Sequence, residues 1–328
     1  MRRSVKFLIV TAIAATALFI GNTSQWISAP APGPSLLAHR GLGQNFDLTN
    51  IKNDDCTATR MLPPRHSFIE NTITSIDQAF KLGADVVELD IHPTTDGQFA
   101  IFHDWALDCR TNGTGVTRKA SMSSLKTLDV GYGYTADGGR TFPFRGKGVG
   151  LMPSLDEVLA AFPDRTLLIN IKSNDPAEGR LLADYLAKLP RARRDKLMVY
   201  GGDRPVGVVR EAHPDMRTMS RATLQSCYLQ YIALGWSGYI PASCRNSVLL
   251  TPTNVGPWMW GWPHRFQKRF AAVNSVFFVV APYYGGGFSN GIDNADTLRL
   301  LPSGYVGGIS TDSIDVLAPL VGAKDATP

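Results

Sequence analysis

Two histidines stand at the ends of short apolar segments, where imidazole groups could transfer protons. His39 follows the segment Ser35–Ala38, and His103 ends the segment Gln98–His103. An ordinary imidazole has a pKa of about 6.5, which suits acid and base catalysis at neutral pH. A lone histidine is more often structural, but two at equivalent positions favour an acid/base pair.

Two carboxylates occupy alternate positions in the short β-branched segment Asp85–Ile91 (DVVELDI). Glu88 and Asp90 therefore leave the same face of the expected strand. Two buried carboxylates are unfavourable unless a cation neutralises them, and oxygen ligands suit Mg²⁺ or Ca²⁺. The alternative is a structural ion-pair network with Arg40 and Lys172, and we favour the metal site.

Two cations complete the candidate chemistry. The planar guanidinium of Arg40 can hold phosphate oxygens, and Lys172 supplies a second positive charge at the end of another segment. Together with a metal and two histidines they describe a site for an anionic phosphoryl transition state. His92 lies two residues after Asp90, so it is a third titrating group, a metal-shell residue or a hydrogen-bonding histidine.

Buried apolar strands that alternate with amphipathic helices must bring these residues together. Thr166–Lys172 is typical of a buried strand, and Ser154–Phe162 predicts a helix with a capping box of Ser154 and Glu157. About eight such units follow one another, which favours a single-domain α/β fold, a closed (β/α)₈ TIM barrel. The active site of that fold lies at the carboxyl ends of the strands.

The N-terminus predicts export. Arg2 and Arg3 precede the apolar run Phe7–Ile20, the pattern of a secretory signal, although the run is short for a spanning helix of about 20 residues. We assign residues 1–23 to a signal peptide or membrane anchor, 24–34 to a linker and 35–328 to the barrel. The body is then periplasmic or extracellular, with membrane association through the N-terminal segment left open.

Cysteine usage agrees with an oxidising compartment. The four cysteines have no C-x-x-C spacing, so a thiolate metal site is disfavoured. Of three pairings, we favour Cys227–Cys244, which closes a local loop, with Cys56–Cys109; free buried thiols are the alternative. The net charge of +5 is scattered, which disfavours nucleic acid as a partner. The oligomeric state does not follow from the sequence.

Several segments occur in the order found in one enzyme family. They are AHRG (38–41), ENT (70–72), GADVVELDI (83–91), DGQFAIFHD (96–104), LDCRTNGTG (107–115), PSLDEVL (153–159), INIK (169–172) and GGISTD (307–312). With these segments the chain resembles the glycerophosphodiester phosphodiesterase family. The resemblance implies a TIM barrel that cleaves a glycerophosphodiester to glycerol phosphate and an alcohol, with the glycerol hydroxyl of the substrate as nucleophile.

The resemblance also implies roles for single residues. His39 and His103 correspond to the general acid/base pair, Glu88 and Asp90 to ligands of a divalent metal, and Arg40 and Lys172 to phosphate contacts. Glu70 would lie in the site and orient His39, Arg40 or a ligand.

One position departs from the family pattern. Asn170 stands where the family commonly has a glutamate, the third metal ligand. An amide oxygen can still bind a cation, but the site loses one negative charge, so we expect weaker metal binding. A non-catalytic barrel that binds phosphodiesters is therefore retained as an alternative. The anchor-like N-terminus and the run of Trp258, Trp260 and Trp262 support another alternative, a lysophospholipase-D-like or sphingomyelinase-D-like lipid phosphodiesterase.

Overall fold

A closed barrel of parallel strands forms the centre of the molecule. The computed structural model describes residues 2–24, 27, 33–52, 55–285 and 290–322. Eight strands follow the order β6-β5-β4-β2-β1-β9-β8-β7, and a parallel bridge between Thr218 and Ser247 brings β6 beside β7. The strands are β1 (Ser35–Ala38), β2 (Val86–Pro93), β4 (Thr166–Ile171), β5 (Leu197–Gly201), β6 (Arg217–Ser220), β7 (Val248–Pro252), β8 (Val276–Val280) and β9 (Gly308–Thr311). The expected TIM barrel is confirmed.

Alternation along each strand separates two apolar layers. The interior of the barrel is filled by one buried side chain from each of seven strands: Leu37, Val86, Leu168, Met198, Met219, Val248 and Phe278. The opposite faces of the strands pack beneath the helices in the largest core cluster, where β2 contributes Val87, Leu89 and Ile91. Glu88 and Asp90 therefore point to the interior side of β2, as the period-two pattern predicts.

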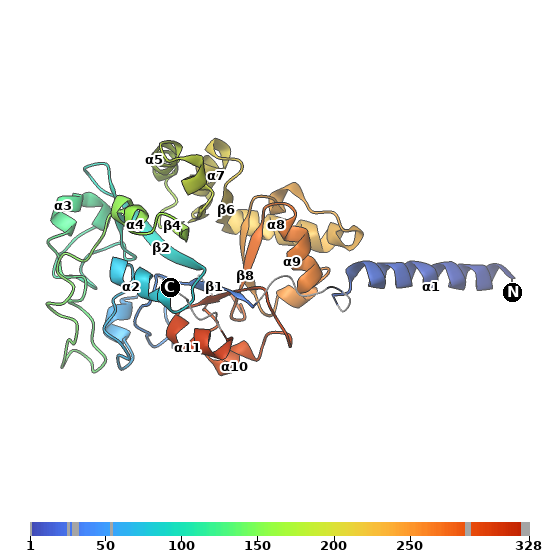
Figure 1. The fold of residues 1–328 in the computed structure, drawn as a ribbon, viewed down its shortest axis with the longest axis horizontal. Coiled ribbons are helices and arrows are strands. Elements are labelled where there is room, and N and C mark those ends of the chain that lie inside the picture. The colour runs from blue at the N-terminus through green and yellow to red at the C-terminus, as the bar shows by residue number, and fades with distance from the viewer. Residues whose placement is uncertain (1, 25–26, 28–32, 53–54, 286–289, 323–328) are drawn as a thin grey trace.

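Helices cover the outside of the barrel (Figure 1). They are α2 (Ile73–Lys81), α3 (Met122–Leu125), α4 (Leu155–Ala161), α5 (Pro176–Ala187), α6 (Arg191–Arg194), α7 (Asp203–Ala212), α8 (Arg221–Leu234), α9 (His264–Ala271), α10 (Ala295–Leu298) and α11 (Ile314–Leu320). The expected capping box begins α4: the Ser154 amide donates to Glu157 at 2.8 Å, and the Glu157 amide donates to the Ser154 hydroxyl at 3.3 Å.

One strand does not belong to the barrel. The segment expected at Gln98–His103 contains β3 (Phe99–Ile101), which pairs antiparallel with β2 through Ile91 and Ile101. The reason is a tight turn after β2, where Gly97 has a φ of 78°. His103 therefore reaches the site from the return arm of a hairpin. After it, residues 105–150 form an insertion around a second, smaller core.

Both favoured disulfides are present, Cys56–Cys109 and Cys227–Cys244, and the described part of the chain has no free cysteine. The first ties the segment before α2 to the insertion. At the N-terminus, helix α1 (Arg2–Asn22) projects away from the barrel (Figure 1). Most of the expected linker 24–34 lies outside the described residues.

Candidate active site

A pocket of about 1110 Å³ contains most of the residues expected to do chemistry. Its lining includes His39, Arg40, Glu88, His103, Asn170 and Lys172. They come from the ends of β1, β2 and β4 and from the segment after β3, and β2 and β4 set Asp90 directly beside Asn170. Residues distant in the sequence therefore meet at one end of the barrel, as the fold predicts.

Asp90 is fully buried and surrounded by donors. Its Oδ1 accepts a hydrogen bond from Asn170 Nδ2 at 2.9 Å and lies 3.4 Å from Lys172 Nζ. Its Oδ2 accepts from Asn71 Nδ2 at 3.0 Å and lies 3.3 Å from Arg40 Nε. Burial opposes ionisation, but Lys172 and the other nearby cations hold the pKa of Asp90 well below its ordinary value. The ion pairs considered as the alternative to a metal thus do form around Asp90.

Glu88 has a different environment. Its Oε1 accepts from the Tyr200 hydroxyl at 2.7 Å, and its Oε2 accepts from the Arg40 amide at 3.1 Å and lies 3.7 Å from His39 Nε2. Burial and the charge of Asp90 raise the pKa of Glu88. Arg40 itself has a φ of 58°, an uncommon left-handed conformation that brings its amide to Glu88. A cation beside Glu88 would stabilise its ionised form.

The oxygen ligands offered by this site are of the type that a hard cation binds while it keeps part of its water shell. Among the described residues no group of three or more His, Cys, Asp or Glu side chains is placed to hold a metal. Glu88 and Asp90 supply two carboxylates, and the third candidate ligand, Asn170, supplies a neutral amide. Such a set suits Mg²⁺ or Ca²⁺ with water ligands, at lower affinity than a site with three carboxylates.

His39 is held by a carboxylate that the sequence did not single out. Asp312 follows β9, and its Oδ1 lies 2.5 Å from His39 Nδ1. Asp312 is itself fixed, because its Oδ2 accepts from the Gly291 amide at 3.0 Å and its own amide donates to Asp293 at 2.6 Å. Although burial and Arg40 disfavour the imidazolium, Glu88 and Asp312 raise the pKa of His39.

His103 has a matching partner. Its Nδ1 lies 2.7 Å from Asp104 Oδ1. Burial and the neighbouring Arg40 lower the pKa of His103 to about 4, so the free site holds it neutral. Each histidine therefore has one ring nitrogen fixed by an aspartate, and the other remains available for chemistry.

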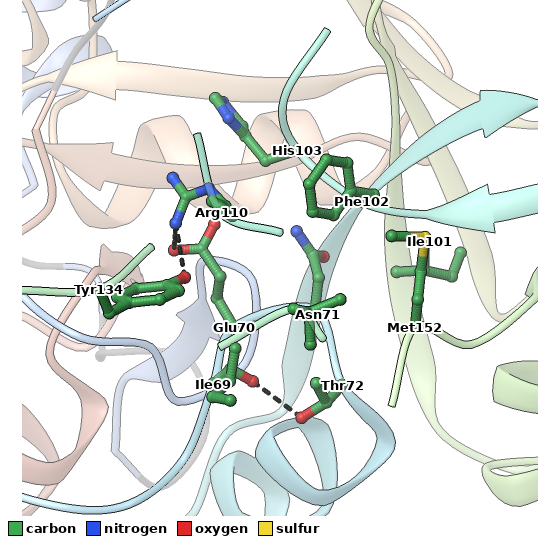
Figure 2. Close-up of a pocket in the computed structure, with 11 residues that line it drawn as sticks. Ile69, Glu70, Asn71, Thr72, Ile101, Phe102, His103, Arg110, Tyr134 and Met152 are labelled. Atoms are coloured by element: carbon green, nitrogen blue, oxygen red, sulfur yellow. Dashed lines mark hydrogen bonds and ion pairs between the residues drawn. The ribbon is translucent and has the colours of Figure 1, made fainter. Parts of the chain in front are cut away.

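Behind His103 lies Arg110, a buried residue of the insertion (Figure 2). Its Nε lies 2.9 Å from Asp104 Oδ2, and its Nη1 lies 3.0 Å from Glu70 Oε2 and donates to the Tyr134 hydroxyl at 2.5 Å. Its Nη2 donates to Thr57. A void of about 10 Å³ beside these groups has room for about one water molecule.

Glu70 extends this network to Arg40 in the large pocket, since its Oε1 lies 3.0 Å from Arg40 Nη1. Ionic contacts thus run from His103 through Asp104, Arg110 and Glu70 to Arg40. Glu70 contacts Arg40, one of the roles foreseen for it. Arg110 belongs to the matched segment LDCRTNGTG, but its contact with both carboxylates was not foreseen.

His92 does not line the pocket. It is fully buried, its ring packs edge-on against Trp105 at 5.9 Å, and its Nε2 lies 3.4 Å from the backbone oxygen of His103. Burial lowers the pKa of His92 to about 4. It therefore supports the segment that carries His103.

A model of the glycerophosphoryl diester phosphodiesterase family matches residues 39–235, more than half of the 328 residues. A glycerophosphodiester phosphodiesterase from Caldanaerobacter subterraneus is 35% identical over 103 residues, covering 31% of this chain and 39% of that protein. One from Bacillus subtilis is 37% identical over 114 residues, covering 34% and 38%. A human lysophospholipase D is 32% identical over 142 residues, covering 40% of each. The chain spans about two fifths of the length of these relatives.

Solved structures share the fold. A glycerophosphodiester phosphodiesterase from Agrobacterium tumefaciens is similar with a TM-score of 0.55 and 23% identity, covering 88% of this chain and 98% of that one. A phosphodiesterase from Oleispira antarctica, solved with the product sn-glycerol-3-phosphate, is similar with a TM-score of 0.54 and 17% identity, covering 88% and 97%. At these identities the likeness concerns the fold alone.

Proposed function

Because this chain belongs to the glycerophosphoryl diester phosphodiesterase family, we propose that it hydrolyses glycerophosphodiesters to glycerol phosphate and an alcohol. The main support is that both histidines, His39 and His103, line one pocket with Arg40 and Lys172. Two groups able to transfer protons and two cations are what cleavage of an anionic phosphodiester requires.

In this proposal His39 and His103 form the acid/base pair. One accepts the proton of the attacking glycerol hydroxyl and the other protonates the leaving alcohol, which leaves a cyclic phosphodiester. Water then opens this ring to glycerol phosphate, with the two histidines in exchanged roles. Arg40 and Lys172 bind the phosphate oxygens, and Glu70 orients Arg40 through their 3.0 Å ion pair. Asp312 and Asp104 hold the two imidazole rings in place.

A divalent cation, Mg²⁺ or Ca²⁺, is part of the same proposal. Glu88, Asp90 and the amide of Asn170 would hold it. When bound, the cation supplies positive charge to the phosphate. Because Asp90 already contacts Arg40 and Lys172, the cation competes with these side chains, and we expect modest affinity.

Lipid substrates form a second candidate class. Much of the pocket wall is apolar, with Phe46, Leu48, Ile51, Leu224, Leu250 and Val255 among its lining residues. A wall of this kind can bury an acyl chain, which favours a lysophospholipase-D-like activity, and a sphingomyelinase-D-like activity would use the same surface. The similarity to a human relative named lysophospholipase D supports this second class.

A substrate panel tests these proposals. Purified protein is assayed on glycerophosphocholine, lysophosphatidylcholine and sphingomyelin, with Mg²⁺, Ca²⁺ or chelator. We expect release of glycerol phosphate from glycerophosphocholine, and its loss on chelation. Turnover of the lipids alone would favour the second class. No turnover of any diester in any metal would leave a non-catalytic binding barrel.

Variants test the acid/base pair separately. His39→Ala and His103→Ala should each lower kcat by about 10²- to 10⁴-fold and leave the circular dichroism spectrum unchanged. His213→Ala is the control, because that ring donates to the backbone oxygen of Ala183 and does not line the pocket. Full activity in both active-site variants would refute the assignment.

A further inference from the structure

Helix α1 exposes apolar side chains, such as Phe7 and Val10, that are unfavourable in water. Within the described residues it is the one helix apolar and long enough to cross a membrane, and 0% of its Val5–Asn22 window is buried against the body. These 18 residues extend about 27 Å, close to the hydrocarbon thickness of about 30 Å. Composition alone does not separate an anchor from a cleaved signal, so the contacts of α1 matter.

The last turn of α1 is bonded to the barrel through α9. Arg265 donates from Nε to the Thr23 oxygen at 3.0 Å and from Nη2 to the Ile20 oxygen at 3.2 Å. Arg269 donates from Nη2 to the Gly21 oxygen at 3.0 Å. The final carbonyls of a helix lack partners within the helix and carry partial negative charge, so cations there are stabilising. Two arginines thus act as a built C-terminal cap for α1.

Three further hydrogen bonds hold the same end of α1. The side chain of Asn22 accepts through Oδ1 from Arg269 Nη1 at 3.0 Å and donates through Nδ2 to the Trp236 backbone oxygen at 2.8 Å. Ser24 donates to the Gly261 oxygen at 2.6 Å.

Removal of α1 by a peptidase would take away the acceptors of Arg265 Nη2 and Arg269 Nη2. Arg269 Nη1 would keep the Tyr231 hydroxyl and the Gly235 oxygen. The body of the protein is therefore built to hold the helix.

Exposed apolar residues follow α8 to the turn that contacts α1. They are Leu229, Ile232, Leu234, Trp236 and Tyr239, each 42–70% exposed, on the second half of α8, the 3₁₀ turn Gly235–Ser237 and the residues after it. We call this surface the α8 patch. Trp236 bonds to Asn22, so the patch begins where the apolar helix ends. Trp and Tyr are the side chains enriched where membrane meets water.

We propose that α1 is retained as a membrane anchor and that the α8 patch rests in the interface of the same bilayer. If α1 spans the membrane, its C-terminal Asn22 lies at the water boundary, and the groups bonded to Asn22 lie there too. The patch is held at that depth by Arg265 and Arg269. This proposal is independent of the hydrolytic activity.

Helix α8 extends from the α8 patch to the pocket. Leu224 and Tyr228, in the first part of α8, line the pocket, and the second half of α8 carries the patch. The 14 residues of α8 extend about 21 Å. The pocket wall therefore lies within about one helix length of the bilayer, where phosphodiesters derived from lipids are released.

The anchor is tested on the full chain expressed in bacteria. We expect the mature protein in the membrane fraction, resistant to carbonate, extracted by detergent, and with an intact mass that includes α1. A soluble mature protein that begins after residue 22 would overturn the proposal. Arg265→Ala with Arg269→Ala should keep the membrane location but increase cleavage by added protease between α1 and the barrel. Unchanged cleavage would show that the cap does not hold the helix.

The patch is tested in vesicles of brominated phosphatidylcholine, whose bromine atoms quench nearby tryptophans. We expect Trp236→Ala to remove part of the quenching, and the control Trp105→Ala, which changes a pocket residue, to leave it intact. Equal quenching in wild type and Trp236→Ala would overturn the patch even if α1 is retained. Dimers in detergent that Ile232→Asp dissociates would assign the patch to a second copy of the chain instead.

Discussion

Arg110 Nε lies 2.9 Å from Asp104 Oδ2, although Arg110 belongs to the insertion and Asp104 to the segment that delivers His103 to the pocket. The same guanidinium contacts Glu70, which holds Arg40. An arginine that does not line the large pocket thus contacts the carboxylates that hold His103 and Arg40. The insertion is therefore part of the active-site framework.

Replacement of Arg110 should damage both stability and turnover. Within the described residues, Arg110→Ala removes the only arginine that contacts Asp104 and one of the two that contact Glu70, which keeps the other. Breaking a buried ion pair in this way costs about 3–5 kcal/mol. We expect a fall of that size in the free energy of unfolding, measured with urea, and a lower kcat. Arg145→Ala is the control, because Arg145 is exposed on the same insertion and stacks on Phe142. Equal losses in the two variants would contradict a special role for Arg110.

The ion pairs of Arg110 with Glu70 and Asp104 predict that the folded protein is less stable in acid. Burial opposes ionisation of Glu70 and Asp104, but Arg110 outweighs it and lowers both pKa values from the ordinary 4.5 and 3.8. A group with a lowered folded pKa contributes stability above its unfolded pKa, and that stability is lost as the pH falls through the folded value. We expect the free energy of unfolding to decrease below about pH 4.5.

Urea titrations between neutral and acid pH measure this slope. In Arg110→Ala the two carboxylates lose the cation that lowers their pKa values most, so their contribution to the slope should become smaller. Arg145→Ala should keep the slope of the wild type. A slope that is the same in all three proteins would show that other groups govern the acid response.

Local patterns in the sequence were sufficient to predict most of the strands and helices of the barrel. The strand expected at Thr166–Lys172, which is β4, and the capping box of α4 were predicted because an apolar strand and a helix cap are local signals. The partner of β3 was not predicted, because the apolar pattern of Gln98–His103 does not distinguish parallel from antiparallel pairing. The Asp96-Gly97 pair between the two segments was the available signal, since it is typical of a hairpin turn.

The site residues likewise include some that local patterns predicted and others that they did not. His39, Glu88 and Lys172 were placed together because strand ends meet at one face of a barrel. That rule also applies to Asp312, which directly follows the last strand, so it could have been singled out. The contacts of Arg110 could not be predicted, because they depend on how the irregular insertion folds back on the barrel.

Asp312 should act on turnover through His39. Asp312→Asn removes the carboxylate 2.5 Å from His39 Nδ1, so the ring loses its fixed orientation. We expect a lower kcat with little change in KM. Burial and Arg40 lower the pKa of His39, and Glu88 and Asp312 raise it, so without Asp312 the pKa falls. The limb of the pH–rate profile that reports His39 should then move to lower pH.

Asp315→Asn is the matched control for this variant. Asp315 lies three residues further along and pairs with Arg65 at 3.2 Å on the surface, so its loss should leave both kcat and the pH profile unchanged. An Asp312→Asn variant with a lower kcat and an unmoved profile would indicate a structural role rather than positioning of His39.

Asn170→Glu tests why this site has an amide where a third carboxylate was expected. Asn170 Nδ2 donates to Asp90 at 2.9 Å, so a glutamate here replaces a hydrogen bond by repulsion between two carboxylates. Without metal we expect a lower melting temperature. With excess Ca²⁺ or Mg²⁺ the loss should be recovered, because a ligand at about 100 times its Kd stabilises the folded state by about 2.7 kcal/mol.

Asn170→Gln separates charge from size, because glutamine has the length of glutamate and no charge. Its melting temperature should respond to metal no more than that of the wild type, and calorimetric titration should show tighter metal binding in Asn170→Glu alone. If the glutamate and glutamine variants respond alike, residue 170 does not contact the metal. Since Glu88 and Asp90 are retained in both variants, a difference between them isolates the third charge as the determinant of metal affinity.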